Sequence, residues 1–471
     1  MLTKSDFLLY LDAPLHLWAQ SHDLLHVTPS TYDQHLMKQG YAVEKVAKEY
    51  LTKYILPKYK HAELLWQPTY KSGDYESRAD GLIHDLDSDT YDLYEIKSST
   101  STKKDHLPDD TFQSIVIGEN VTIGTVNLVL LNDKYVRGDE IDIEQLFSVP
   151  NVTDEVREMT GDIEAKMRDA LSVIKSDNHD KILNCLKPNT CPCPELCHPN
   201  LPHPSIYNIP NLSIKKRREL EDQQILSLSD LPLDYPLTPN QQKHMDVMLS
   251  KTPYLDKPTV TSLLQGLTYP LYFLDYETYD EAMPLYKGHK PYQKMVFQFS
   301  LHVLESEGAE YTHFEHLAMK TGDPALDTVK AMRKAIGDTG SVIVWNDTFE
   351  GGRNNEMAKM FPEYSEFLLN VNKRIFDLMD VVSKGYYLHP NFGGRYTIKK
   401  VLPVMVPELS YKDLTINKGD QAMTAWWEMV NMEGKNLGVK KQAIAGALLQ
   451  YCELDTFAMV RIWEELKKLI V

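Results

Sequence analysis

The sequence predicts an α/β protein with two successive α/β cores. Short apolar and β-branched runs alternate with segments of helical spacing, first before residue 200 and again after about residue 266. Strands separated by helical crossovers are typical of an α/β fold. The length of 471 residues allows two or three domains at roughly 150 residues each. With 42% hydrophobic and 25% charged residues, such a chain can bury sizeable cores.

The first core begins with helices and continues with short strands. Helical spacing runs from residue 1 to about residue 60. Apolar runs bounded by turn residues then predict strands, and longer segments without breakers predict helices. In chain order these elements are strands at 64–66, 81–83 and 91–96, a helix at 111–117, a strand at 125–131 and a helix at 154–183.

The second core follows a Cys- and Pro-rich segment and a polar connection. Residues 205–265 carry helical and turn signals without a large apolar core. We therefore expect domains at 1–200 and 266–471, joined by a mainly helical connecting region at 201–265. The elements expected in the second domain are strands at 272–274, 295–304 and 341–345, a helix at 325–336, a mostly helical segment at 354–369 and a long helical region at 443–469.

The sequence lacks the usual signals of a membrane or secreted protein. No stretch reaches the roughly 18 uninterrupted apolar residues that predict a membrane helix. The opening residues 1–6 are too polar for a signal peptide. We therefore expect a cytoplasmic protein that has no membrane partner.

The formal net charge of −17 argues against simple electrostatic binding of nucleic acid through a basic surface. It does not argue against an acidic metal site, because bound cations reverse the local sign of the charge. Four short basic runs are candidate phosphate contacts, although any single run is more often solvated surface. These runs are 103–104, 215–218, 399–400 and 440–441.

Two carboxylates and a lysine lie at the ends of neighbouring predicted strands. Asp80 precedes the strand at 81–83, and Glu95 and Lys97 end the next strand. Residues i and i+2 of a strand share a face, so Glu95 and Lys97 project together, and a hairpin brings Asp80 beside them. Two carboxylates can hold a hard divalent cation, while the lysine orients water and steadies charge on a phosphate. The alternative is a surface ladder of salt bridges.

The residues around this group resemble a nuclease family. The segments QGYAVE at 39–44, YEIKSS at 94–99 and DTFQ at 110–113 are similar to RecB-like members of the PD-(D/E)xK superfamily, in particular to the nucleases of CRISPR spacer acquisition. The resemblance covers roughly residues 2–197 and implies a restriction-endonuclease-like fold. It places Glu44 near an additional metal-ligand position. It also makes Gln113 the glutamine that accompanies the active site.

Four of the five cysteines are clustered, which in a cytosolic protein indicates metal binding more than disulfides. They are Cys185, Cys191, Cys193 and Cys197. Thiolates bind zinc tetrahedrally or ligate an iron–sulfur cluster. The alternative is four reduced, unligated thiols in a Pro-rich loop.

Related RecB-like nucleases hold an iron–sulfur cluster with one N-terminal cysteine and three cysteines near the end of the domain. By resemblance, Cys185, Cys191 and Cys197 match the three later positions, whereas the N-terminal position falls on Ala13. Three outcomes stay open. Cys193 supplies the missing ligand of a 4Fe–4S cluster, zinc replaces the cluster, or no metal binds.

Four further carboxylates follow separate elements of the second core. Asp275 and Glu277 lie two residues apart after an apolar strand and therefore share a face. Glu350 follows the strand at 341–345, and Tyr451 and Asp455 lie one helical turn apart. Four carboxylates can hold two divalent ions about 4 Å apart, the arrangement for attack of water on a phosphodiester. A tyrosine hydroxyl beside them can position that water.

The order D-x-E-T, N-x-x-F-E and Y-x-x-x-D resembles the DnaQ-like DEDD exonucleases of the tyrosine subtype, which have an RNase H-like fold. The resemblance makes Asp275, Glu277 and Asp455 metal ligands and makes Tyr451 the residue that orients water. Glu350 stands where that family usually has aspartate, one methylene shorter. Asp377 resembles a substrate-side aspartate and is not expected to bind metal.

The whole C-terminal region is similar to a family of uncharacterised domains fused behind RecB-like nuclease domains. Segments YTIKKVLP at 396–403 and LSY at 409–411 carry this resemblance. It implies a DNA-binding hydrolase that uses Mg²⁺ or Mn²⁺, with a 3′–5′ exonuclease site at 266–471 and a second nuclease site at 1–200. Single-stranded DNA or DNA ends are the expected partner, in repair, recombination or defence. The alternatives are a nucleic-acid clamp with one decayed site and an RNA exonuclease.

Overall fold

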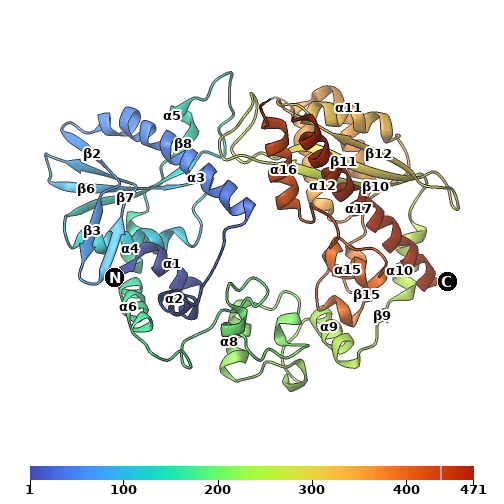
Figure 1. Cartoon of the computed structure of the whole chain (residues 1–471), viewed down its shortest axis with the longest axis horizontal. Helices are drawn as coiled ribbons and strands as arrows, with labels where there is room; N and C mark the ends of the chain where they lie inside the picture. The colour runs from blue at the N-terminus through green and yellow to red at the C-terminus, as the bar shows by residue number, and fades with distance from the viewer. Residues whose placement is uncertain (435–436) are drawn as a thin grey trace. The chain divides into compact units, whose positions relative to one another are not determined.

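The computed structural model describes residues 1–434 and 437–471. The chain divides into two compact units, each with its own core. Unit 1 contains residues 1–200 and 281–293, and unit 2 contains residues 201–280 and 294–471. Both units combine helices with β-sheets (Figure 1), which confirms the predicted α/β class.

Unit 1 is built on a five-stranded mixed sheet with the strand order β2-β5-β6-β7-β8. The first three strands pair antiparallel, and β6 pairs parallel with β7 because a helix crosses between them. The strands are β2 (Ala62–Trp66), β5 (Gly81–Asp85), β6 (Thr90–Lys97), β7 (Ile123–Leu131) and β8 (Phe147–Ser148). A small second sheet, not predicted from the sequence, joins β1 (Leu2–Thr3), β4 (Tyr75–Arg78) and β3 (Thr69–Ser72).

Seven α-helices surround the sheets of unit 1 in the part of the chain that is described. They are α1 (Lys4–Asp12), α2 (Pro14–Ser21), α3 (Thr31–Tyr50), α4 (His106–Gly118), α5 (Ile143–Leu146), α6 (Thr153–Ile174) and α7 (Pro194–Cys197), and α3 continues into the short turns η1 (Leu51–Ile55) and η2 (Leu56–Lys58). Helix α6 ends at Ile174, not at the predicted residue 183. The reason is local: Ser176 Oγ donates to Asn178 O, and Asp180 N donates to Asn178 Oδ1. Such side-chain bonds compete with helical ones.

Unit 2 is built on a five-stranded sheet with the order β12-β11-β10-β13-β14. Its strands are β10 (Leu271–Tyr279), β11 (Met295–Leu304), β12 (Thr312–Leu317), β13 (Ser341–Val344) and β14 (Ile375–Asp377). The first three form an antiparallel meander, and β13 and β14 run parallel to β10. Residues 281–293, which follow β10, pack in unit 1, where Ala282 N donates to Gln39 Oε1.

The helices and minor elements of unit 2 complete its fold. They are η3 (Ile206–Asn208), α8 (Ile214–Asp222), η4 (Leu228–Asp230), α9 (Pro239–Ser250), β9 (Tyr254–Leu255), α10 (Lys257–Gln265), α11 (Ala325–Ala335), α12 (Asp347–Met360), η5 (Pro362–Tyr364), α13 (Ser365–Lys373), α14 (Asp380–Ser383), β15 (Tyr387–Leu388), η6 (Pro390–Phe392), α15 (Ile398–Met405), α16 (Gly419–Asn431) and α17 (Gly438–Ile470). Residues 201–265, expected to form a separate connection, belong to this unit. Residues 354–369 are mostly helical, as expected: α12 and α13 cover most of them, and Pro362 separates the two helices.

By length and composition alone, helix α17 is long and apolar enough to cross a membrane. Half of its most apolar part is buried inside the protein. The helix packs against β10, β11 and β12 of the unit 2 sheet (Figure 1). Its apolar character is therefore accounted for by its place in the core.

Candidate functional site

The four carboxylates predicted in the second core converge in unit 2. Asp275 and Glu277 come from β10, Glu350 from the first turn of α12, and Asp455 from α17. All four line one cavity of about 540 Å³, together with Tyr451. The arrangement follows from topology, because β13 runs parallel to β10 and delivers α12 to the same edge of the sheet.

A lysine also lines this cavity, and a second tyrosine bonds one of its carboxylates. Lys399 Nζ donates to the Tyr451 hydroxyl at 3.0 Å and to Asn417 O at 2.8 Å. The Tyr411 hydroxyl donates a hydrogen bond to Asp455 Oδ1 at 2.6 Å. From the sequence, Lys399 was expected only as part of a basic run, and Tyr411 had no predicted role. Both lie on segments between β14 and α17, so only the fold brings them to the carboxylates.

Burial and mutual repulsion raise the pKa values of these carboxyl groups. For Asp275 the loss of hydration is the main cause, and the neighbouring Asp455 and Glu277 raise the pKa further. Burial raises the pKa of Glu350 to about 8. The pKa of Asp455 rises only to about 6, because the hydrogen bond from Tyr411 opposes the effect of burial. Without a counter-charge the cavity therefore retains protons near neutral pH.

The carboxyl groups of this cavity fit divalent cations. Glu350 is 2% exposed, and its Oε2 has no hydrogen-bond partner among the described residues. Ligand atoms of Asp275, Glu277 and Cys452 lie within 4.8 Å of one another. A buried carboxylate without a partner is costly, and a bound cation removes that cost. Asp275, Glu277, Glu350 and Asp455 would hold such ions.

Asp377 lies at the border of this site in a structural role. Its carboxylate accepts hydrogen bonds from the backbone N–H of Asp347 at 3.2 Å and of Met379 at 2.9 Å. These bonds connect the end of β14 to the start of α12. The carboxylate is thereby engaged by the backbone.

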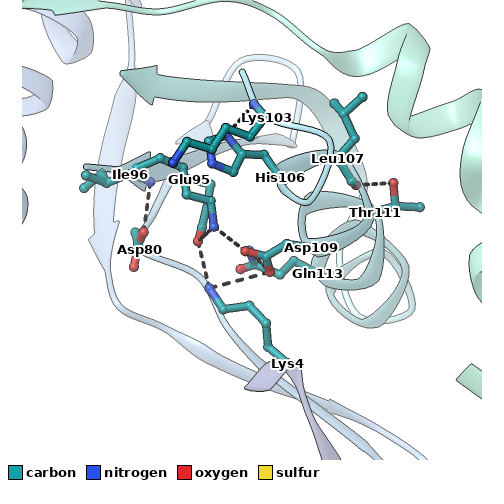
Figure 2. Close-up of polar contacts among 11 residues, drawn as sticks. Lys4, Asp80, Glu95, Ile96, Lys103, His106, Leu107, Asp109, Thr111 and Gln113 are labelled. Atoms are coloured by element: carbon teal, nitrogen blue, oxygen red, sulfur yellow. Dashed lines mark hydrogen bonds and ion pairs between the residues drawn. The ribbon is translucent and has the colours of Figure 1, made fainter. Parts of the chain in front are cut away.

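The carboxylates predicted in the first core also meet at one cavity, of about 330 Å³, in unit 1. Glu44 on α3, Asp80 before β5 and Glu95 on β6 line it. Asp80 Oδ2 accepts the backbone N–H of Ile96 at 2.9 Å, as Figure 2 shows. Burial and the charge of Glu95 raise the pKa of Asp80 to about 7.

Two charged residues that the sequence did not predict complete this site. Lys4 Nζ lies 2.7 Å from Glu95 Oε1 and 3.8 Å from Asp109 Oδ1, and Figure 2 shows it reaching between the two carboxylates. The predicted Lys97 lies 2.9 Å from Glu95 Oε1 and also contacts Asp109. Gln113 Nε2 donates to Asp109 Oδ1 at 3.4 Å. Asp109 lies one helical turn before Gln113 on α4. This four-residue spacing is visible in the sequence and is the signal that could have revealed Asp109.

The two lysines control the charge of the buried Glu95. Burial alone raises the pKa of Glu95, but Lys97 and Lys4 overcome this effect and lower it to about 2. Burial lowers the pKa of Lys97, and the carboxylates of Glu95 and Asp109 raise it overall, so this lysine stays protonated. Asp110 is fully buried, and its pKa rises to about 9 because of burial and the charge of Glu95. Both oxygens of Asp110 have no hydrogen-bond partner among the described residues.

The four clustered cysteines converge in unit 1, together with a histidine that the sequence did not predict. Ligand atoms of His16, Cys191, Cys193 and Cys197 lie within 4.8 Å of one another. Cys191 Sγ is 3.5 Å from His16 Nε2, and Cys193 Sγ is 3.7 Å from Cys197 Sγ. His16 lies on α2, three residues after Ala13, so it occupies the region where a fourth ligand is missing.

The surroundings of this centre suit a metal ion. Asp12 Oδ2 lies 2.9 Å from His16 Nδ1, the arrangement in which a carboxylate orients a metal-binding imidazole. The pKa of Cys185 falls to about 2 because of a hydrogen bond from Cys197, despite burial, with His16 and His198 adding to the effect. A thiolate is the form that binds metal. The other three thiols keep their protons, because burial raises the pKa values of Cys191 and Cys193 and a hydrogen bond with Cys185 raises that of Cys197. The closeness of the His16, Cys191, Cys193 and Cys197 ligand atoms is what lets the centre hold a metal ion, which would displace those protons.

Known proteins resemble parts of the chain. A family described as a domain of unknown function (DUF2779) matches residues 272–397, which include Asp275, Glu277 and Glu350 but end before Tyr451 and Asp455. An uncharacterized protein of Ureaplasma parvum serovar 3, UU173, is 34% identical over 146 residues. That match covers 28% of this chain and spans 21% of the length of the Ureaplasma protein.

One solved structure is similar over part of the chain. It is an alkaline exonuclease from Laribacter hongkongensis, at 12% identity, and the match covers 37% of this chain and 89% of the exonuclease. Its TM-score is 0.25, a value that supports no inference about fold or activity.

Proposed function

We propose that unit 2 is a metal-dependent nuclease that hydrolyses phosphodiester bonds in DNA and removes nucleotides from the 3′ end. One observation carries the proposal: Asp275, Glu277, Glu350 and Asp455, from three separate elements, meet beside the Tyr451 hydroxyl in one cavity. The sheet order also supports it, because an antiparallel meander continued by two parallel strands is compatible with the RNase H-like fold that the sequence resembles.

The residues of the unit 2 cavity divide the work of phosphodiester hydrolysis. When bound, two divalent cations would neutralise charge on the phosphate and lower the pKa of an attacking water. Burial and the charge of Asp455 raise the pKa of Tyr451, so its hydroxyl stays protonated. The hydroxyl therefore orients water by hydrogen bonding and does not act as a base.

Lys399 adds positive charge to this acidic cavity. A lysine ammonium has three donors, and two of them bond Tyr451 and Asn417. The third can bond an oxygen of the scissile phosphate. The positive charge of Lys399 attracts the phosphate to the site although the protein as a whole is acidic. Lys399 thus fixes the orientation of Tyr451 and offers one contact to substrate.

We further propose a second nuclease site in unit 1, of the PD-(D/E)xK type. The observation that favours it is the convergence of Glu44, Asp80 and Glu95 at one cavity, with Lys97 at 2.9 Å from Glu95. Glu44, Asp80 and Glu95 would hold a divalent cation there, and Lys97 is protonated and placed to steady charge on a phosphate. Glu95 Oε2 is buried without a hydrogen-bond partner among the described residues, as expected for an oxygen that a cation would engage.

The test is degradation of single-stranded DNA and RNA that carry a label at the 3′ or the 5′ end, with Mg²⁺ or Mn²⁺. We compare the wild type with Asp275→Asn, Lys97→Ala and the double variant. Asp275→Asn should abolish stepwise loss of 3′ nucleotides, because a metal ligand of the unit 2 site is removed. Lys97→Ala should abolish the cleavage by unit 1 that remains in Asp275→Asn. Asp327→Asn on the exposed face of α11 and Lys45→Ala on the exposed face of α3 serve as matched controls.

Each alternative has its own outcome in this assay. Cleavage of RNA but not DNA would replace the DNA proposal by an RNA exonuclease. Binding of labelled DNA without any cleavage would favour a nucleic-acid clamp with decayed sites. Activity that is unchanged in both single variants and in the double variant would refute both proposed sites.

A further inference from the structure

A second group of metal-binding side chains lies in unit 2, apart from the four carboxylates. Ligand atoms of His302 on β11, His313 on β12 and Glu453 on α17 lie within 4.8 Å of one another. The two histidines are register partners on neighbouring strands, and their rings stack with centroids 4.5 Å apart. Helix α17 packs over both strands, as Figure 1 shows, and so brings Glu453 to them.

A chain of hydrogen bonds behind the two rings favours one placement of the ring hydrogens. Thr456 Oγ1 donates to Glu453 O at 3.0 Å, so it accepts from its other partners. His302 Nδ1, at 2.9 Å, and Ser300 Oγ, at 2.7 Å, are these partners and therefore donate to it. With its hydrogen used, Ser300 Oγ accepts from His313 Nε2 at 2.9 Å.

This pattern leaves a lone pair on the other nitrogen of each ring. Nε2 of His302 and Nδ1 of His313 are then the unprotonated atoms, the form in which imidazole binds a metal. Hydrogen bonds at the remote nitrogen that fix the tautomer are a usual feature of metal-ligating histidines. The network is thus arranged as outer support for a metal site.

The distances and exposure also suit an ion that enters from solvent. His313 Nδ1 lies 3.9 Å from Glu453 Oε1, against about 3.4 Å between two ligands of a tetrahedral zinc ion with bonds of about 2.1 Å. The Glu453 side chain is 49% exposed and His313 is 23% exposed, so both can move the remaining distance. His302 is 6% exposed and gives a fixed third ligand.

We propose that His302, His313 and Glu453 form a site for a divalent transition metal of the zinc class. Two nitrogen ligands and one carboxylate favour zinc, cobalt or iron over magnesium, which prefers oxygen ligands alone. This separates the site chemically from the carboxylate cavity. The bound ion would tie α17 to the β11–β12 hairpin, and α17 also carries Tyr451 and Asp455. The proposal does not depend on the proposed nuclease function.

The test counts zinc ions on the full-length protein. Wild type and variants are dialysed against Zn²⁺ with excess Mg²⁺ present, so that Mg²⁺ occupies the carboxylate cavity, and bound zinc is measured by mass spectrometry. His313→Ala and Glu453→Gln should each bind about one zinc ion fewer than the wild type. His316→Ala, on the same strand β12, is the matched control and should bind as many as the wild type.

Cobalt separates this site from the cysteine centre. Co²⁺ bound to thiolates absorbs in the near ultraviolet through sulfur-to-metal charge transfer, whereas nitrogen and oxygen ligands give only visible bands. His313→Ala should lose visible intensity and keep the thiolate band. Zinc counts that are unchanged in both His313→Ala and Glu453→Gln, or that fall equally in His316→Ala, would overturn the proposal.

Discussion

Replacing Glu350 by glutamine should stabilise unit 2 when divalent cations are absent. Glu350 is 2% exposed, and burial raises the pKa of its carboxyl group from 4.5 to about 8. Between these values the unfolded chain releases the proton while the folded chain keeps it. Stability therefore falls as the pH rises from 4.5 to about 8. Glutamine has nearly the same shape but cannot ionise, so the variant lacks this loss.

The size of the effect follows from the same pKa change. Each pH unit between the two pKa values lowers the free energy of unfolding by about 1.4 kcal/mol. At pH 7 the free energy of unfolding of the wild type is therefore about 3 kcal/mol lower than at pH 4.5. The difference in this free energy between Glu350→Gln and the wild type should grow by the same amount from pH 4.5 to pH 7. Bound Mg²⁺ or Mn²⁺ should reverse the order, because the cation stabilises only a site that keeps its ligand.

Urea denaturation at pH 5.0 and pH 7.5, with EDTA or with Mn²⁺, measures this prediction. Tryptophan fluorescence suits it, because four of the six tryptophans lie in unit 2. Glu310→Gln, at an exposed position between β11 and β12, is the control and should show no pH-dependent difference. A gain for Glu350→Gln that is equal at both pH values would refute the reasoning, as would a variant less stable than the wild type at pH 7.5 in EDTA.

Three further predictions concern single side chains. Tyr451→Phe should reduce cleavage by unit 2 about 10²-fold while bound Mn²⁺ is unchanged, since only the orientation of water is lost; full activity would rule out this role. His16→Ala should lower the zinc or iron content of the cysteine centre, measured by elemental analysis, whereas His26→Ala at an exposed position should not; equal metal content in both variants would contradict ligation by His16. Lys4→Met should destabilise unit 1 by about 2 kcal/mol in urea, because Glu95 loses a charged hydrogen bond at 2.7 Å; a loss below about 0.5 kcal/mol would mean that Lys97 alone compensates Glu95.

Much of each candidate site follows from local patterns in the sequence. Asp275 and Glu277 share a face because side chains alternate along a strand, and Tyr451 and Asp455 share a face because of the helical repeat. The structure places both pairs at the cavity of unit 2. The alternation of apolar runs also predicts the α/β class, since periodicity is a property of neighbouring residues.

Local patterns account less well for the ends of elements and for short polar strands. The hairpin of β3 and β4 has the sequences TYKS and YESR, which lack an apolar alternation. Helix α6 is shortened by side-chain hydrogen bonds around Asn178. These outcomes depend on competition between individual bonds, which hydrophobic periodicity does not record.

The sequence by itself determined the α/β class and which carboxylates share a face in each candidate site. The reason is that strand and helix periodicity fix which neighbouring side chains project together. Only the tertiary structure decided which distant residues join them. Lys4 lies 91 positions from Glu95, and Lys399 lies 52 positions from Tyr451. His16 reaches the cysteine centre across 175 positions. The packing of whole elements determines which distant residues contact a buried group. The charge of that group depends on those contacts.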